Sequence, residues 1–275
     1  ELQAPFGGTK MSSFGPREQV RGVEGIVRHA RLLNPALDIV LLHFADPGKL
    51  DSYRAGRTPE VIQSHERVAA HYAIPSLDLA REIAERIDSS EFTWDRDFVN
   101  LHPFGQTLYS RSIVRLLEAA WKEPSAPGAE ARPHALPPAL DANSYFRGRL
   151  LAPDRVPLSA GWRVDAKWHP SDKGATRPGF VDVPMLIADT PGAELRLPFD
   201  GTAIGLFVAS GPDAGVVEYS VDGAPFRRQE LQTQWSPRLH IPWAYVLDGD
   251  LKPGAHELRL RLVSGAVRIA HILLN

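Results

Sequence analysis

The sequence predicts an α/β domain followed by an antiparallel β-sandwich. Residues 17–121 alternate helical apolar stripes with short apolar runs, which is typical of an α/β layer on a parallel sheet. Residues 123–140 are rich in Pro and Ala without any period, as expected of an extended linker. Beyond them, short runs of alternating apolar and polar residues are separated by Gly, Asp and Pro turns. We therefore expect domains over residues 1–122 and 141–275, joined by a linker over 123–140.

The composition excludes several classes of function. The chain has 275 residues and a formal net charge of −2, so it lacks the basic surplus that neutralises phosphates. We therefore expect neither nucleic acid nor a membrane as a partner. The chain contains no cysteine, which excludes a disulfide framework and thiolate metal sites. No apolar run reaches the roughly 18 residues that a membrane-spanning helix needs.

The first half opens with a predicted helix and a predicted buried strand. Apolar residues recur at helical spacing in REQVRGVEGIVRHARLLNP, and Pro35 ends this segment. The members of this apolar stripe are Val20, Val23, Ile26, Val27 and Ala30. The continuous apolar run of ALDIVLLHFADP, residues 36–47, fits a strand that is buried on both faces of a parallel sheet.

Three further segments complete the α/β pattern. TPEVIQSHERVAAHYA has Thr58 as a predicted N-cap and Pro59 at the first helical position. IPSLDLAREIAERI, residues 74–87, predicts a short strand that passes into another helix. LYSRSIVRLLEAAW, residues 108–121, is the last strong helical pattern in the chain.

The second half carries strand signals only. Period-two alternation recurs in AELRLPF, TAIGLFVAS, GVVEYSVDG, HELRLRLVSG and VRIAHILLN. Asp222 and Gly223 occupy the place where a tight hairpin turn needs positive φ. No helix of useful length is visible after the linker. This half is therefore predicted to be an antiparallel β-sandwich of the jelly-roll type.

The His-Pro step in DFVNLHPFGQTLYS, residues 97–110, supplies the sharpest catalytic candidate. The proline biases His102 away from helical dihedral angles and removes a backbone donor from the start of the helix. The imidazole is thereby held on a loop, where it can face a cleft. His102 could act as a general base oriented by a carboxylate, with Asp97 as the nearest partner and Asp95 as the next. Alternatively, His102 only caps the loop and these acids are solvated.

The other polar candidates have simpler interpretations. His65 and His71 do not share a helical face as a metal-binding pair at i, i+4 would, so packing or surface positions are favoured. His43 lies at the end of a strand, where we expect a buried, hydrogen-bonded side chain or one that faces a cleft. Ser12 and Ser13 match neither a phosphate loop nor a nucleophile elbow, which favours a surface loop.

Aromatic residues of the second half could form a platform for sugars, because aromatic faces stack on sugar C–H groups. The candidates are Trp162, Trp168, Trp235, Trp243 and Tyr245. For most of them, packing in the sandwich core is favoured. The density of Trp, Arg, His and Tyr in QWSPRLHIPWAY, residues 234–245, instead indicates a surface or inter-domain contact.

Four segments in order carry a family resemblance: RGVEGIVRHARLLNP, IVLLHFADP, HERVAAHYAIPSLDLA and DFVNLHPFGQTLYSRSIVRLLEAAW. Together they resemble the later part of an SGNH (GDSL-type) hydrolase, whose final block is Asp-x-x-His-Pro followed by a Gly and a helix. The second half is similar to the β-sandwich appended to some multidomain SGNH esterases, several of which deacetylate carbohydrates. The resemblance implies a partial three-layer α/β domain followed by a jelly-roll-like β-sandwich.

The resemblance also implies catalytic roles. In that family a Ser attacks an ester carbonyl, a His takes its proton and an Asp orients the His, while backbone N–H groups and an Asn stabilise the oxyanion. His102 corresponds to the general base. The family's acid position, three residues earlier, is Val99 here, whereas Asp97 lies two residues further upstream and Asn100 lies closer. Either the loop is longer and Asp97 still reaches the imidazole, which we favour, or the triad is reduced to a dyad.

The family's other blocks are missing from this sequence. Its Gly-Asp-Ser block, its oxyanion Gly and its Gly-x-Asn-Asp block all precede the helix that starts near Arg17. An α/β domain of this type needs about five strands, and two isolated strands leave apolar faces and edges uncovered. Only two clear parallel strands are predicted here, with ELQAP as the tail of a third. We predict that the missing N-terminal strands belong to the biological protein.

The leading expectation is a serine ester hydrolase of SGNH type that removes small acyl groups, expected to be acetyl, from a carbohydrate. This expectation implies no metal or organic cofactor. If the substrate is a polysaccharide, it also implies that the protein is exported from the cell. The alternative is a non-catalytic carbohydrate-binding or interaction protein on a degraded hydrolase scaffold. A phosphodiester or phosphoryl enzyme is disfavoured, because neither a phosphate cradle nor a metal-ligand cluster is visible.

Overall fold

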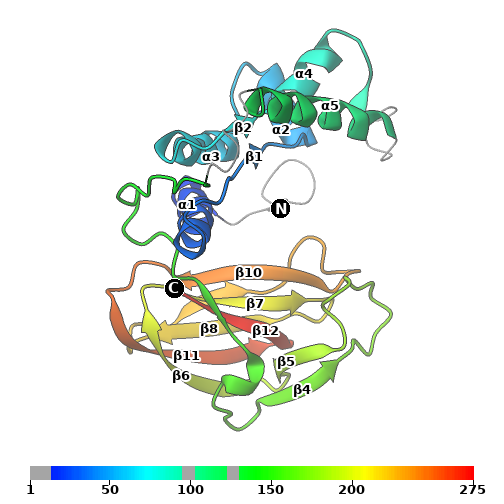
Figure 1. Cartoon of the computed structure of the whole chain (residues 1–275). Coiled ribbons are helices and arrows are strands. Elements are labelled where there is room, and N and C mark those ends of the chain that lie inside the picture. The colour runs from blue at the N-terminus through cyan, green and yellow to red at the C-terminus, as the bar shows by residue number, and fades with distance from the viewer. Residues whose placement is uncertain (1–13, 95–102, 123–129) are drawn as a thin grey trace. The chain divides into compact units, whose positions relative to one another are not determined.

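The computed structural model describes residues 14–94, 103–122 and 130–275. The chain divides into two compact units, Glu1–Phe146 and Arg147–Asn275, and each is considered by itself (Figure 1). The first unit combines helices with a parallel strand pair, and the second consists of antiparallel sheets. The predicted fold class, an α/β domain followed by an antiparallel β-sandwich, is confirmed. Within the described residues, no helix has the length and apolar character needed to cross a membrane.

The first unit alternates helices with two short strands. In chain order the elements are α1 (Pro16–Leu33), β1 (Leu41–Leu42), α2 (Pro47–Arg54), α3 (Glu60–His71), β2 (Ser76–Leu77), α4 (Leu79–Asp88) and α5 (Pro103–Ala120). The sequence did not predict α2, although its start carries clear signals: Asp46 accepts a hydrogen bond from the Lys49 backbone N–H, and Pro47 stands at the first helical position. The other helices lie on the predicted helical segments, but α3 begins one residue later than expected, with Pro59 and not Thr58 as its N-cap, and α5 begins at Pro103, before its predicted segment.

β1 and β2 form a parallel pair that is much shorter than the predicted strand over residues 36–47. Leu41 pairs with Ser76 and Leu42 with Leu77. The pair stops there because the next residue of the second strand, Asp78, already caps α4 by accepting a hydrogen bond from the Arg81 backbone N–H. The strand prediction is therefore correct in place and wrong in length.

α1 and α3 pack through the predicted apolar stripe of α1. Val20, Val23 and Val27 are buried against Val68 and Tyr72. Ile26, which was expected in the same stripe, is 46% exposed. The difference follows from helix geometry, because position 26 is turned by about 100° from its neighbour 27 and so faces away from α3.

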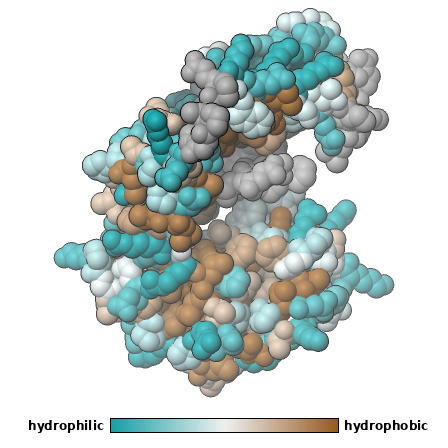
Figure 2. Space-filling model, in the orientation of Figure 1, coloured by the Kyte–Doolittle hydropathy of each residue, from teal (hydrophilic) through white to brown (hydrophobic). Residues whose placement is uncertain are grey.

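Among the described residues of the first unit, several apolar side chains are exposed and one edge of β1 has no paired strand. Apolar side chains are exposed on α1 and on the chain leading into β1, namely Ile26, Leu32, Leu33, Leu37 and Val40, and Figure 2 shows apolar surface around α1. The N–H groups of Leu41 and His43 donate to the carbonyl oxygens of Pro75 and Leu77. The backbone N–H and C=O groups of the alternate residues of β1 therefore point toward its other edge. Parallel sheets are normally covered on both faces. This edge and these side chains therefore have the character of an interface.

The second unit is a sandwich of two antiparallel sheets (Figure 1). One sheet has the order β10-β7-β12-β5-β4, with β3 also paired to β12, and the other has the order β6-β11-β8-β9. The strands are β3 (Arg149–Leu151), β4 (Arg163–Trp168), β5 (Val183–Ala188), β6 (Glu194–Gly201), β7 (Ile204–Ser210), β8 (Val216–Val221), β9 (Arg227–Glu230), β10 (Ile241–Asp248), β11 (Gly254–Ser264) and β12 (Val267–Leu274). Between residues 130 and 275, which are described without a gap, the only helical element is one short 3₁₀ turn.

The inner faces of the two sheets form the core of the second unit. Leu258 and Leu260 of β11 are fully buried against Leu206 of β7 and Ile269 of β12. The hairpin between β8 and β9 turns at Asp222 and Gly223, whose φ angles are 54° and 75°. Positive φ at both central residues confirms the predicted turn.

Candidate functional site

The predicted catalytic segment lies outside the described residues. The positions concerned are His102, Asp97, Asp95, Val99 and Asn100. The structure does describe both flanks, because the chain is placed up to Trp94 and α5 begins at Pro103. The predicted general base, His102, therefore immediately precedes α5 in the chain. The contacts of α5 fix the point at which the chain leaves the predicted catalytic segment.

Tyr109 fixes α5 to the carboxyl end of the parallel strand pair. The backbone N–H of Ala45, just past β1, donates to Tyr109 Oη at 3.0 Å. The rings of Phe44 and Tyr109 meet edge to face with centroids 5.0 Å apart. Burial raises the pKa of Tyr109 to about 12, so the phenol stays neutral at physiological pH. In open α/β sheets ligands bind beyond the carboxyl ends of the strands, which makes this edge the candidate site.

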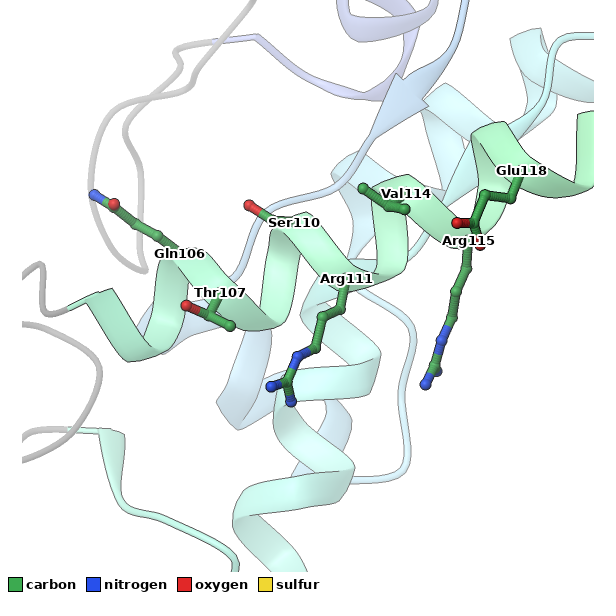
Figure 3. Close-up of a pocket in the computed structure, with 7 residues that line it drawn as sticks. All are labelled: Gln106, Thr107, Ser110, Arg111, Val114, Arg115 and Glu118. Carbon is green, nitrogen blue, oxygen red and sulfur yellow. The ribbon is translucent and has the colours of Figure 1, made fainter. Parts of the chain in front are cut away.

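A cavity of 530 Å³ lies along the exposed face of α5 (Figure 3). Its described lining consists of Gln106, Thr107, Ser110, Arg111, Val114, Arg115 and Glu118. Arg111 and Arg115 extend side by side from one side of the helix, and Gln106 and Ser110 project from the other (Figure 3). Within the described part of the chain, neither guanidinium group forms an ion pair.

This lining can hydrogen-bond a hydroxyl-rich or anionic ligand, because it offers guanidinium, amide, hydroxyl and carboxylate groups. It contains no histidine beside Ser110 or Thr107 among the residues described, so a proton-accepting group would have to come from elsewhere. Sequence reasoning missed this face. The spacing of Gln106 with Ser110 and of Arg111 with Arg115 places each pair on one side of a helix and could have revealed it.

His43 lies at the carboxyl end of β1 in a buried polar cluster. Its side chain is almost fully buried, and its Nε2 lies 2.6 Å from Glu66 Oε1. Ser76 Oγ donates to the other Glu66 oxygen at 2.9 Å, and the His65 ring lies 5.8 Å from the His43 ring. His43 is therefore a buried, hydrogen-bonded side chain, the first of the two expected alternatives. His71 Nε2 contacts the Pro138 carbonyl oxygen at 2.8 Å, which agrees with a packing role.

We expect His65 to make the first unit sensitive to acid. Burial is the main cause that lowers the pKa of His65 to about 4; electrostatic interactions with His43 and Lys49 act in the same direction, and Glu66 acts in the opposite direction. Between pH 6.5 and 4 the unfolded chain therefore binds more protons at this residue, so stability is lost as the pH falls. The loss should be at most about 3 kcal/mol. Urea denaturation followed by helical circular dichroism at pH 7 and pH 4.5 measures it.

The His65→Gln variant tests the assignment of this acid sensitivity. It cannot take up the proton, so its urea midpoint should change less than that of the unmodified chain between the two pH values. His169 is exposed in the second unit, and His169→Gln provides the matched control. An equal acid response in the unmodified chain and in the His65→Gln variant would contradict the prediction.

For the remaining candidates that lie in the described residues, burial distinguishes a packing role from a binding role. No group of three or more His, Cys, Asp or Glu side chains suited to a metal occurs in the described ranges. Ser12 and Ser13 lie outside these ranges. In the sandwich, Trp162, Trp168 and Tyr245 are buried, which confirms the core interpretation for them.

The segment QWSPRLHIPWAY is only partly a surface feature. Trp235 is 37% exposed and Arg238 is exposed, as a contact surface would require. Ser236 and His240, by contrast, are buried, and the surface interpretation is wrong for them. Their burial has a polar cause, because Ser236 Oγ and Ser210 Oγ are hydrogen-bonded at 2.6 Å and His240 Nε2 contacts Asp172.

Comparisons with known proteins identify a shared fold. No protein-family model and no curated protein sequence matches this chain. Among solved structures, a two-domain esterase active on acetylated mannans gives a TM-score of 0.66 at 16% identity, covering 93% of this chain and 68% of that chain. A two-domain esterase of the same description, co-crystallised with mannopentaose, gives a TM-score of 0.65 at 16% identity, covering 93% of this chain and 67% of that chain. The chain thus has the fold of about two thirds of a two-domain esterase.

Proposed function

We propose that this chain is part of a serine ester hydrolase of the SGNH type that removes small acyl groups, acetyl in the first instance, from a carbohydrate. His102 is its general base and Asp97 orients His102. The proposed domains are an α/β hydrolase domain whose helices and strands lie within residues 1–122 and a β-sandwich whose strands lie within 141–275. The observation that carries the proposal is the His-Pro step at the start of α5, whose proline is the first residue of the helix, on a fold shared with two-domain esterases.

The contacts of α5 support this assignment. A general base must be held within hydrogen-bond reach of the nucleophile, so the element that follows it has to be fixed. Tyr109 bonds α5 to the carboxyl end of β1 at 3.0 Å, and Ser112 Oγ donates to Glu82 of α4 at 2.6 Å. These two bonds anchor α5, the helix that follows His102, to the end of β1 and to α4.

The nucleophile and the oxyanion groups belong to N-terminal strands that pair with β1. One edge of β1 pairs with no strand among the residues that the structure describes, and apolar side chains around it, including Leu37 and Val40, are exposed; both observations support such strands. This chain matches 67% and 68% of the two similar esterases, so about one third of each esterase lies outside the matched part. In this arrangement a Ser supplied by those strands meets His102 at the carboxyl edge of the sheet.

The proposed substrate is an acetylated glycan, with acetylated mannan as the first one to test. The solved structures with this fold are described as active on acetylated mannans. The α5 face offers the donors and acceptors that sugar hydroxyls need, and its arginines, Arg111 and Arg115, have no ion-pair partner among the described residues. The mechanism needs no metal, since the His and the oxyanion groups supply the proton transfer and the charge stabilisation.

We expect the complete polypeptide that contains this sequence to release acetate from acetylated mannan. The measurement is acetate release from native mannan and from the same mannan after alkaline deacetylation, which serves as the control. A fluorophosphonate that reacts with activated serines should abolish the release and add its mass once to the protein. Absence of acetate release from mannan and from p-nitrophenyl acetate would overturn the proposal and favour a non-catalytic carbohydrate-binding protein.

A further inference from the structure

α1 carries a stripe of charged residues that sequence alone would place in solvent. Its members, the charged stripe, are Arg17, Arg21, Glu24, Arg28 and Arg31. Their spacing of three or four residues places them on one side of the helix. Yet Arg21, Glu24 and Arg31 are only 1%, 0% and 4% exposed. Charged groups are buried to this extent only when they are paired or hydrogen-bonded.

The cover over this stripe is the chain between residues 134 and 146. We infer that this segment, the strap, is an integral part of the first unit that is latched to α1 by the buried carboxylate of Glu24. The strap runs antiparallel to α1. Near the end of α1, the His134 N–H donates to the Pro35 carbonyl oxygen at 2.8 Å, and Arg31 donates to the Ala135 carbonyl oxygen at 3.2 Å.

Glu24 holds the middle of the strap. Its Oε1 accepts hydrogen bonds from the Leu140 backbone N–H at 2.6 Å and from Tyr72 Oη at 2.7 Å, and its Oε2 accepts one from the Asp141 N–H at 3.1 Å. One carboxylate thus joins α1, the end of α3 and the strap. Such charge-assisted bonds to backbone N–H groups are among the stronger hydrogen bonds in proteins.

Arg21 and Arg28 hold the strap on either side of Glu24. Arg21 donates to both oxygens of Asp141, at 2.8 and 3.2 Å, so this pair is bidentate. Arg28 donates to the Pro137 carbonyl oxygen at 2.6 Å. Pro137 and Pro138 have no N–H group to satisfy, so this part of the strap offers only acceptors, which suits a helix face that is rich in arginine.

Gly25 brings the strap against the helix backbone. A Cβ atom at this position would lie 2.7 Å from the carbonyl carbon of Tyr145, a distance at which the strap would have to move. The Tyr145 N–H also donates to the Arg21 carbonyl oxygen at 3.2 Å. Gly22 on the same helix has open space around its Cα. A glycine within α1 lowers helix propensity, and close approach of the strap explains Gly25.

Hydrogen exchange of the complete chain tests the strap directly. The amides of Leu140 and Asp141 should exchange as slowly as those in the middle of α1, because the same buried bonds must open. Exchange within about threefold of the rate for an unstructured peptide would overturn the inference. This arm needs no variant, and it does not depend on the proposed esterase activity.

Two variants test the mechanism of the latch. Gly25→Ala should raise exchange at Leu140 and Asp141 at least about tenfold, whereas Gly22→Ala should leave it unchanged. Glu24→Gln replaces an acceptor oxygen with an NH₂ group that opposes a backbone donor, and it should have an effect at least as large. Glu85→Gln, at an exposed position on α4, is the matched control. Unchanged strap exchange in both Gly25→Ala and Glu24→Gln would overturn the latch.

Discussion

Replacing His102 by alanine should lower kcat for acetyl-ester hydrolysis by about 10⁶-fold, the loss seen when the histidine of a Ser–His–Asp triad is removed. The reason is that the serine hydroxyl is a weak nucleophile until a neighbouring base takes its proton. KM should change little, because the imidazole acts on the proton and does not hold the glycan. The measurement is p-nitrophenyl acetate hydrolysis by the complete polypeptide and by the His102→Ala variant.

A control separates loss of the base from loss of the fold. His169 is exposed in the second unit, and its replacement by alanine should leave kcat unchanged. Circular dichroism should show the same helix content in both variants, because α5 is anchored by Tyr109 and Ser112 and not by the loop alone. Equal rates for the unmodified protein and for His102→Ala would remove the triad and leave a binding protein as the better explanation.

Several strands of the sandwich could be predicted because one face is more buried than the other. β6, β8 and β11 show this alternation, and their segments were predicted from it. β5 was missed because both faces are covered: Leu186 lies in the main core, while Met185 and Ile187 lie in a second apolar cluster. β9 was missed for the opposite reason, since RRQE is a polar edge strand.

The helical unit was predictable in its elements and less so in its tertiary contacts. The stripe of Val20, Val23 and Val27 predicted α1 and the face that packs on α3. Nothing in the local pattern indicates that Arg21 and Glu24 on the adjacent face are buried, because their cover, the strap, comes more than a hundred residues later in the chain. Charge periodicity therefore predicts a helix face and not its exposure.

The candidate site shows the same limit. The His-Pro step is a local signal, since proline restricts the residue before it, and it pointed to His102. The anchoring role of Tyr109 was not predicted, because it depends on a hydrogen bond from Ala45. Ala45 lies far from Tyr109 in the sequence and contacts it only in the folded chain. Which acid pairs with His102 is likewise a question of distance in space, and the positions of Asp95, Asp97 and Asn100 in the sequence leave it open.

Replacing Asp97 by asparagine should lower kcat by about 10⁴-fold, because an amide in place of the carboxylate favours the wrong imidazole tautomer and removes the charge that stabilises the imidazolium. If Asp97 is the orienting acid, Asp95→Asn and Asn100→Ala should each lower kcat less than tenfold. The pH profile of kcat/KM adds an independent readout, since losing a neighbouring carboxylate lowers the pKa of the histidine and moves the alkaline plateau to lower pH.

The three variants together distinguish the alternatives at this loop. A large loss with Asp95→Asn and a small one with Asp97→Asn would transfer the role to Asp95. Small losses with both would mean a Ser–His dyad, in which Val99 occupies the family's acid position without replacement elsewhere in the loop. A dyad lacks the fixed tautomer, so its kcat should already be low in the unmodified protein. High kcat together with insensitivity to all three changes would require an acid from another part of the protein, such as the proposed N-terminal strands.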